Sequence, residues 1–200
     1  MLAGVSHDLR TPLTRMKLQL SLMEDSLAKK ELENNIKEMT VMLDSYVSFV
    51  RGEAPETIEK INLNSLIEDI CLTNNSIKDK ITTKYTNKII TSGRALQIKR
   101  AIQNIIDNSI RYSSKINVEL KSDEGECFIS ISDNGPGIPE KNYEDVFKPF
   151  FTLDPSRNKL KGESGLGMTI TRDIIRSHGG EIKLSKSIKN GLKIFISLPL

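Results

Sequence analysis

The chain has no tryptophan, only two cysteines and few aromatic residues, and each shortage argues against a class of protein. Aromatic residues make up 5% of the 200 residues, which leaves few surfaces on which nucleic-acid bases could stack. The two cysteines, Cys71 and Cys127, lack the spacing of a metal site, so a reduced, cytosolic environment is the simplest interpretation. No apolar run approaches the roughly 18 residues that cross a membrane. A signal peptide, with a basic stretch before an apolar one, is also absent from the N-terminus.

Basic and acidic residues are present in nearly equal numbers. The net charge is +3 from 29 basic and 26 acidic residues, spread along the chain, so we expect no nucleic-acid partner. With 38% hydrophobic and 28% charged residues, the composition is that of one large or two small globular domains. We expect no membrane contact within this segment. Because the chain opens inside a patterned helix, we expect it to be the soluble part of a longer protein.

Residues 2–50 have the spacing of two helices that form an antiparallel hairpin. Apolar residues recur at intervals of three and four, as in coiled-coil seams, and we expect the turn near Lys29–Glu31. A single hairpin has little to bury its apolar stripe against, which predicts a homodimeric four-helix bundle. The seam positions are Leu2, Val5, Leu9, Leu13, Met16, Leu20, Met23 and Leu27, then Leu32, Ile36, Met39, Leu43, Tyr46 and Val50.

The first helix contains a local defect. Two successive intervals of four, from Val5 to Leu13, break the alternation and unwind the supercoil locally. Pro12 lies inside this stretch and has no N–H to donate to the carbonyl of Asp8. The defect therefore lies beside a lone histidine, His7. We interpret it as a point at which the helix can bend.

After a linker at residues 52–56, the pattern changes to short strands and helices. Helices are expected over residues 63–77, 94–113 and 167–180, with Asn62 or Asn64 capping the first and His178 capping the end of the last. A strand is expected at 81–86, and hairpins are expected to turn at Asp123–Gly125 and Asn190–Gly191. This order predicts an α+β sandwich, a sheet with helices on one face. The expected domains are residues 1–54 and 55–200.

Three segments of the second domain have residues suited to a nucleotide. The stretch DNGPGIP at 133–139 follows a strand, and GESGLG at 162–167 runs into a helix, whose N-terminal N–H groups favour phosphate. Asn104 and Asn108 present two amides on one helix face, and amide oxygens are ligands for Mg²⁺. Each segment also has an ordinary explanation: an Asn-Gly turn, a flexible loop, or amides paired within the fold.

Taken together, these segments resemble the N, first glycine, F (FKPFF) and second glycine boxes of the Bergerat-fold (GHKL) ATPases, in order and spacing. The stretch SHDLRTPLT at residues 6–14 resembles the phosphoacceptor box of sensor histidine kinases. The chain is most similar to the osmosensor-type kinases that signal to an OmpR-like response regulator. The resemblance implies a dimerisation and phosphotransfer hairpin joined to an ATP-binding domain, on the cytoplasmic side of an inner-membrane protein.

The resemblance also implies roles for individual residues. His7 would be phosphorylated, with Asp8 holding a proton or acting as base, and Thr11 would place a water for dephosphorylating the response regulator. Asn108 and Asn104 would hold Mg²⁺, and Asp133 would read the adenine amine. Ser109 stands where alanine is usual. The residues assigned to ATP and its metal are Asn104, Asn108, Arg111, Tyr112, Asp133, Gly135, Gly137, Ile138, Phe150, Arg157, Gly165, Leu166 and Gly167.

Two other functions remain open at this point. A GHKL ATPase of the gyrase, chaperone or mismatch-repair kind would use a glutamate four residues before the metal asparagine. That position is Asn104 here, so the water-activating base is missing. The other alternative is a pseudokinase scaffold biased toward phosphatase activity, which the intact boxes do not exclude.

Overall fold

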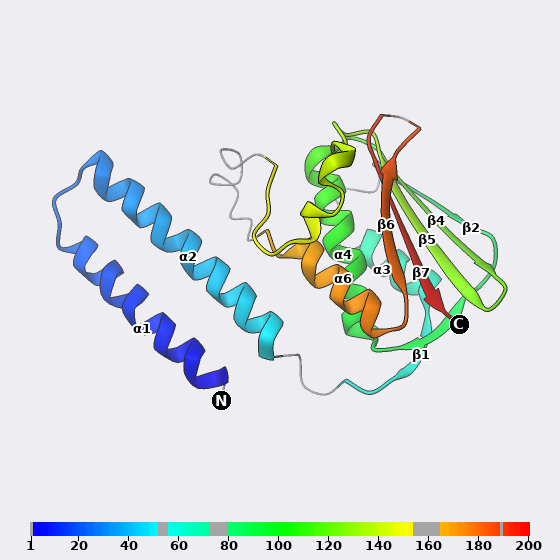
Figure 1. The fold of residues 1–200 in the computed structure, drawn as a ribbon, viewed down its shortest axis with the longest axis horizontal. Coiled ribbons are helices and arrows are strands. Elements are labelled where there is room, and N and C mark those ends of the chain that lie inside the picture. The colour runs from blue at the N-terminus through cyan, green and yellow to red at the C-terminus, as the bar shows by residue number, and fades with distance from the viewer. Residues whose placement is uncertain (1, 52–55, 73–79, 154–164, 189) are drawn as a thin grey trace. The chain divides into compact units, whose positions relative to one another are not determined.

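The computed structural model describes residues 2–51, 56–72, 80–153, 165–188 and 190–200. The chain forms two compact units, drawn in Figure 1. One unit comprises Met1–Pro55 with Pro149–Leu166, and the other comprises Glu56–Lys148 with Gly167–Leu200. Within the described ranges, no helix is both long enough and apolar enough to cross a membrane.

The first unit contains the expected helical hairpin. Helices α1 (Leu2–Ser21) and α2 (Leu27–Arg51) lie side by side (Figure 1). Leu13, Leu20 and Ile36 are buried between them, with Leu43 packed against this cluster. All four residues belong to the predicted seams, so the periodicity identified the contacting faces correctly.

The turn of the hairpin lies earlier in the chain than predicted. The expected turn near Lys29–Glu31 is wrong, because α1 ends at Ser21 and α2 already begins at Leu27. Met23 and Leu27 continue the apolar spacing of α1 across the turn, and this coincidence extended the predicted helix too far.

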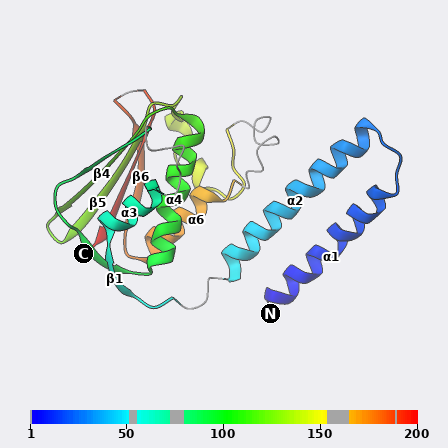
Figure 2. The ribbon, with the colours of Figure 1, turned by 180° about the vertical axis from the view of Figure 1, so that it is seen from behind.

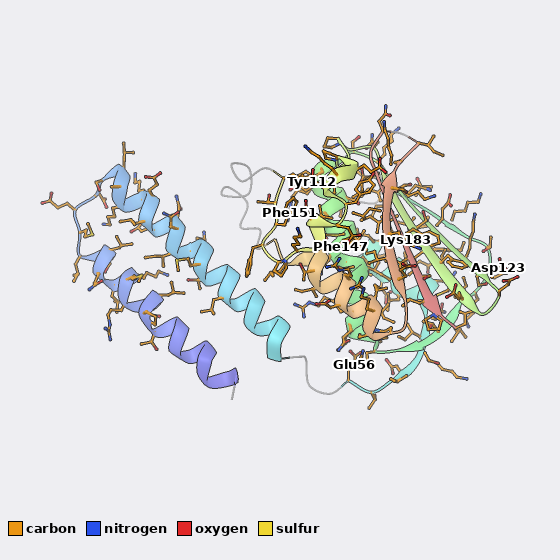
Figure 3. All side chains as sticks on the ribbon, viewed as in Figure 1. Glu56, Tyr112, Asp123, Phe147, Phe151 and Lys183 are labelled. Carbon is orange, nitrogen blue, oxygen red and sulfur yellow. The ribbon has the colours of Figure 1, made fainter. Side chains whose placement is uncertain are left out.

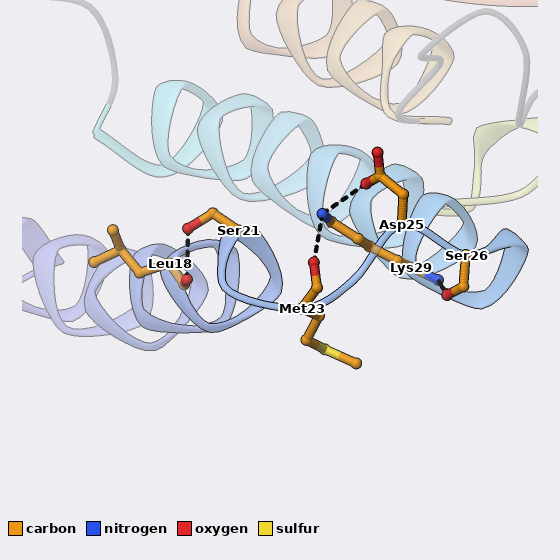
Figure 4. A network of polar contacts seen from close by, with 6 residues as sticks. All are labelled: Leu18, Ser21, Met23, Asp25, Ser26 and Lys29. Carbon is orange, nitrogen blue, oxygen red and sulfur yellow. Dashed lines mark hydrogen bonds and ion pairs between the residues drawn. The ribbon is translucent and has the colours of Figure 1, made fainter.

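Polar contacts determine where α2 begins (Figure 4). The Ser26 hydroxyl accepts a hydrogen bond from the Lys29 backbone N–H at 3.1 Å, as a helix N-cap does. The Lys29 ammonium donates to the Met23 carbonyl and to Asp25 Oδ1, both at 2.8 Å. The hydrogen bond from Lys29 to Asp25, together with the charge of the ammonium group, lowers the pKa of Asp25. Side-chain chemistry at the turn therefore overrides the apolar spacing.

The second unit is built on a five-stranded sheet with the order β2-β4-β5-β7-β6. Strand β2 runs parallel to β4, and the other neighbours are antiparallel. Both predicted hairpins form, and Glu124 and Gly125 adopt φ of 47° and 86° in the first turn, as a two-residue hairpin turn requires. The strands are β2 (Ile81–Tyr85), β4 (Ile116–Asp123), β5 (Glu126–Asp133), β6 (Glu181–Lys186) and β7 (Leu192–Pro199).

A small antiparallel sheet was not predicted. Strands β1 (Glu59–Asn62) and β3 (Ile90–Gly93) pair over four residues each. Strands this short carry almost no period-2 signal, so only their pairing in the fold reveals them.

Helices α3 (Leu63–Leu72), α4 (Ala95–Tyr112) and α6 (Gly167–Ser177) lie on one face of the large sheet (Figures 1 and 2). Alternate residues of β5 are buried beneath them, from Cys127 to Asp133. Two 3₁₀ turns, η1 (Glu140–Asn142) and η2 (Asp145–Phe147), follow β5. The α+β sandwich with helices on one face is confirmed. Its fully buried aliphatic side chains include Ile98, Ile102, Ile105, Ile106, Leu120, Ile129 and Ile131, each contributing roughly 1.5–3 kcal/mol.

Asn62 and Asn64, the two cap candidates for α3, have different roles. Asn62 Oδ1 accepts from the Ser65 N–H at 3.4 Å, so Asn62 is the capping side chain. Asn64 bonds instead across the fold, donating to the Asn87 carbonyl and accepting from the Ile89 N–H. The chain before β3 is thereby attached to the start of α3.

The N-terminus of α4 is capped by a residue from the end of the linker. Both carboxylate oxygens of Glu56 accept from the first turn of α4, at 2.6 Å from Leu96 N and 3.3 Å from Gln97 N. Arg94, the residue before the helix, makes no side-chain cap of its own. Glu56 and Tyr112 lie at opposite ends of α4 (Figure 3). The negative charge also complements the helix dipole.

His178 joins the end of α6 to the start of α4. Its Nδ1 lies 2.7 Å from the Ile174 carbonyl, one turn back, and its Nε2 accepts from the Arg94 N–H at 3.0 Å. Nδ1 therefore carries the ring proton. His178 therefore caps the end of the helix, as the sequence predicted.

Candidate functional site

Asp133 is a buried carboxylate at the end of β5, 7% exposed. Its Oδ1 accepts from the Gly135 N–H at 2.9 Å and from the Leu192 N–H at 3.1 Å. Its Oδ2 accepts from the Ser109 hydroxyl at 3.3 Å. Each oxygen of an ionised carboxylate can accept more than one bond. Oδ2 therefore keeps acceptor capacity for a ligand, in an orientation that three separate segments determine.

Two glycines of the DNGPGIP loop allow close backbone packing. A Cβ on Gly135 would lie 2.8 Å from the Tyr112 carbonyl oxygen, so the loop rests against the end of α4. Gly137 has φ of 69°, and a Cβ there would lie 3.1 Å from the Asn190 carbonyl oxygen. Gly135 thus allows the loop to lie close to α4, and Gly137 also allows a positive φ; both close contacts are with this chain's own backbone.

The turn between β6 and β7 forms a third side of this site. A Cβ on Gly191 would clash with Asp133, both with its carbonyl and with Oδ1, and Leu192 supplies one of the two backbone donors. The sequence indicated a turn at Asn190–Gly191 but not its contact with Asp133, because Asp133 and Leu192 are 59 residues apart in the chain.

The two amides of α4 have different surroundings. Asn104 Nδ2 donates to the Gly167 carbonyl at 3.3 Å and lies 3.5 Å from Thr171 Oγ1, which leaves its Oδ1 as an available oxygen. Asn108 is half-buried, and its amide makes no hydrogen bond within the part of the chain that the structure describes. Both amides therefore present oxygens suited to Mg²⁺. Among the described residues, no group of three or more His, Cys, Asp or Glu side chains could hold a metal by itself.

The aromatic segment before the second glycine loop is attached to α6. The Phe147 carbonyl accepts from Thr169 Oγ1 at 3.0 Å and from Arg172 Nη2 at 3.3 Å. The Arg172 guanidinium also lies 4.7 Å from the centroid of the buried Phe147 ring, a cation–π contact. Figure 3 labels Phe147 beside α6. These contacts hold Phe147 against α6 just before the chain continues to residue 149.

Phe150 and Gly165 meet within the first unit. The Phe150 N–H donates to the Gly165 carbonyl at 3.1 Å, and both residues have φ of 64°. A Cβ on Gly165 would lie 2.9 Å from two backbone atoms of Phe150, so only glycine fits there. Leu166 is buried. Arg157, which the sequence assigns to the phosphates, lies outside the described residues.

The remaining nucleotide candidates are Arg111, Tyr112 and Ile138. Arg111 and Tyr112 are the last residues of the helix and are exposed to solvent. Ile138 follows Gly137 and is half-buried. The structure therefore brings Tyr112 and Asp133 to one locality through Gly135, and it joins Asn104 to the start of α6 through Gly167.

The predicted phosphoacceptor residues lie on α1. His7 and Asp8 fall within the helix, but their side chains are outside the described part. Thr11 is exposed and, four residues after His7, lies on the same helix face. The helix continues through Pro12 to Ser21, so the proline does not end it.

Sequence reasoning missed two contributors to the site and the cap of the helix that carries it. Ser109 was visible as a departure from alanine, yet its hydroxyl contact with Asp133 depends on the packing of α4 against β5. Leu192 contributes a backbone N–H. Any residue except proline could donate this bond, so the side chain at position 192 gives no signal of it. Glu56 caps α4 from 40 residues away. The sequence signals of a helix start lie in residues next to the helix, so they do not reveal this cap.

Two protein families match the chain. Residues 93–200 match the family described as "Histidine kinase-, DNA gyrase B-, and HSP90-like ATPase". Residues 1–74 match the "His Kinase A (phospho-acceptor) domain". The two matches have the order that the sequence motifs indicated.

Curated relatives extend the similarity over the whole chain. Sensor histidine kinase GtrS of Pseudomonas aeruginosa is 30% identical over 204 residues, covering 98% of this chain and 41% of that protein. Sensor histidine kinase CpxA of Escherichia coli is 28% identical over 212 residues, covering 100% of this chain and 46% of that protein. The chain thus spans less than half the length of these relatives.

Solved structures share the fold. The catalytic domain of histidine kinase ThkA matches 72% of this chain and 95% of its own, with a TM-score of 0.63 and 26% identity. Full-length ShkA in complex with AMPPNP matches 99% of this chain and 45% of its own, with a TM-score of 0.72 and 16% identity, which shows a common fold. The chain therefore belongs to the histidine kinase-, DNA gyrase B- and HSP90-like ATPase family, and it has the paired domains of a two-component sensor histidine kinase core.

Proposed function

We propose that this protein phosphorylates itself on His7 with ATP and then transfers the phosphoryl group to an aspartate of a response regulator. The observation that carries the proposal is Asp133, a buried and fully oriented carboxylate with acceptor capacity to spare. It lies beside the end of a helix whose Asn108 amide has no partner in the described structure. A family relationship to sensor kinases over the whole chain supports the same activity.

These contacts support an ATP site. Asp133 accepts a hydrogen bond from the adenine amine, and Gly135 and Gly137 let the loop beside the purine pack closely against the rest of the domain. Tyr112 contacts the nucleotide and Arg111 approaches the phosphates from the exposed end of α4. We also assign Ile138 and Phe150 to the nucleotide, and the second glycine loop and Arg157 to the phosphates. The glycine-loop residues in this proposal are Gly165, Leu166 and Gly167.

Asn108 and Asn104 would hold Mg²⁺ together with the triphosphate. The orientation of Asn104 supports this assignment, because its NH₂ group faces the Gly167 carbonyl and leaves its oxygen available. When bound, Mg²⁺ neutralises charge that builds up on the phosphates during transfer. The same position argues against a hydrolytic ATPase, since Asn104 replaces the glutamate that would activate water.

His7 supplies the nucleophile. Imidazole titrates near neutral pH, so an unprotonated ring nitrogen is available. That nitrogen forms a bond to the γ-phosphorus as the bond to ADP breaks, and Asp8 holds or accepts the imidazole proton. Thr11, on the same helix face, positions a water that dephosphorylates the phosphorylated response regulator.

The proposed partners are a second copy of this chain and a receiver domain. On the hairpin, Met16, Leu32 and Met39 belong to the predicted seams yet are 46%, 46% and 51% exposed. A second hairpin that covers them would complete a four-helix bundle. Size-exclusion chromatography with light scattering should therefore give a dimer at micromolar concentration, and a monomer would contradict this part of the proposal.

The proposed domains are residues 1–54 for dimerisation and phosphotransfer and residues 55–200 for ATP binding. The end of α2 at Arg51 and the contact of Glu56 with α4 support this boundary. We also propose that the core works on the cytoplasmic side of a membrane-anchored sensor, as a part of a longer protein.

The decisive experiment is labelling with γ-labelled ATP and Mg²⁺. The wild-type chain should form a phosphoprotein that is labile in acid and stable in base, as a phosphohistidine is. His7→Gln should abolish the label while His178→Gln, which changes the other histidine, should retain it. Labelling of His7→Gln as strong as that of wild type would refute the assignment.

A further inference from the structure

We propose that Ser109 is a positioning residue that gives the nucleotide site its preference for a 6-amino purine. It does so by fixing the orientation of the Asp133 carboxylate. The inference rests on the proposed ATP site and adds to it a residue that determines which purine is preferred.

The direction of the Ser109–Asp133 hydrogen bond is determined by chemistry. An ionised carboxylate only accepts, so the Ser109 hydroxyl donates its proton to Oδ2 across 3.3 Å. Ser109 is 4% exposed and Asp133 is 7% exposed, so water competes little for this bond. The hydroxyl therefore has one defined role in the fold.

The conformation of Ser109 differs from that of a neighbouring serine. A serine in or just after a helix commonly bonds to the carbonyl four residues back, and Ser113 does so, with its hydroxyl 2.6 Å from the Ser109 carbonyl oxygen. The Ser109 hydroxyl is turned to Asp133 instead. The helix thus directs this side chain at the site rather than at its own backbone.

The two oxygens of Asp133 are held by different means. Oδ1 accepts from the backbone N–H groups of Gly135 and Leu192, so it has a fixed position. The terminal torsion of an aspartate is otherwise broad, which lets Oδ2 swing about that fixed point. Ser109 supplies the donor on the Oδ2 side and defines the carboxylate plane.

A fixed carboxylate plane matters because purines differ at position 6. Adenine presents an amine that donates to Oδ2, whereas guanine and hypoxanthine present an oxygen that a carboxylate repels. Once the Ser109 hydroxyl is removed, the carboxylate can rotate away from the amine. The advantage of the 6-amino group should then decrease, while contacts to the rest of the nucleotide remain.

The test compares two diphosphates that differ only at position 6: ADP and purine riboside 5′-diphosphate, which has hydrogen in place of the amine. Both are titrated calorimetrically into the full chain with Mg²⁺, for wild type, Ser109→Ala and Ser132→Ala. Ser132 is a matched control, because it adjoins Asp133 but points to the opposite side of β5. Diphosphates avoid turnover during the titration.

We expect wild type to bind ADP more tightly than the 6-hydrogen analogue. In Ser109→Ala the ratio of the ADP affinity to the analogue affinity should fall about tenfold, or about 1.4 kcal/mol. The affinity for the analogue itself should stay within about twofold of the wild-type value. Ser132→Ala should leave both affinities unchanged. An unchanged ratio, with or without an equal loss of both affinities, would overturn the inference, since that is the result a merely structural serine predicts.

Failure of the proposed ATP site would look different. Wild type that binds neither diphosphate refutes that site and this inference with it, and wild type without a 6-amino preference refutes the role of Asp133. If circular dichroism shows that Ser109→Ala does not fold, Ser109→Cys retains the size with a weaker donor. A ratio in Ser109→Cys equal to that of wild type would then overturn the inference, and a severalfold reduction would support it.

Discussion

Replacing Asp133 with asparagine changes the chemistry of the proposed adenine contact while preserving its shape. In Asp133→Asn, the amide oxygen can take the place of Oδ1 and accept from Gly135 and Leu192. The NH₂ group then occupies the place of Oδ2, and the Ser109 hydroxyl can rotate to accept from it. The fold should survive with a loss of about 1–2 kcal/mol, because hydrogen bonds to a charged group become neutral ones.

The effect on the nucleotide should be larger and selective. The amide NH₂ would face the adenine amine, so a hydrogen bond to a charged acceptor is lost and two donors oppose each other. A charged hydrogen bond contributes about 1.5–3 kcal/mol. We therefore expect ADP affinity to fall on the order of 100-fold, or about 2.7 kcal/mol. Hypoxanthine offers an acceptor at position 6, so inosine diphosphate should bind the variant better than ADP does.

Calorimetric titration of ADP and inosine diphosphate into wild type and Asp133→Asn measures this inversion, with circular dichroism as the control for folding. ADP binding by the folded variant within about threefold of wild type would refute the assigned role of Asp133. An equal loss for both diphosphates would refute it as well, because it would show that Asp133 does not read position 6.

Further predictions concern stability and the balance of activities. Glu56→Ala removes the cap of α4, so hydrogen exchange in the first turn should accelerate and unfolding should become easier by about 1–2 kcal/mol; unchanged exchange would contradict the capping role. Burial raises the pKa of Cys127 to about 11 from a usual 9.0. The native thiol therefore keeps its proton where the unfolded one loses it, and the free energy of unfolding should decrease as pH rises from about 9 toward 11. Urea titrations should show that Cys127→Ala loses this dependence. Thr11→Ala should retain autophosphorylation but dephosphorylate the response regulator more slowly, and equal rates would remove its assigned role. Pro12→Ala should shift the kinase-to-phosphatase ratio, whereas an unchanged ratio would count against bending at the proline.

The features that the sequence predicted well depend on near neighbours in the chain. The hairpin seam that buries Leu13 and Ile36 follows from a period of three and four residues, because an α-helix places such residues on one face. The β4–β5 hairpin follows from Gly125 at a position that needs positive φ. The amides of Asn104 and Asn108 share a face of α4 for the same geometric reason.

The misplaced turn is a local error, whereas the omissions arise where distant residues meet. The turn before α2 was misplaced because its location depends on the Ser26 cap and on Lys29, and the apolar spacing does not record either contact. The short strands β1 and β3 exist only as a pair. The cap that Glu56 provides to α4 is likewise a contact across the fold.

The candidate site shows both contributions side by side. Its components can be identified from the sequence: an aspartate after a strand, glycines after that, and paired amides on a helix, because each is a local pattern with a local physical reason. The orientation of Asp133 depends on contacts across the fold. Two of its three donors come from Ser109, 24 residues before it, and from Leu192, 59 residues after it. A hydrogen bond needs its two atoms about 3 Å apart, and over such separations only the packing of α4, β5 and the β6–β7 turn brings them that close.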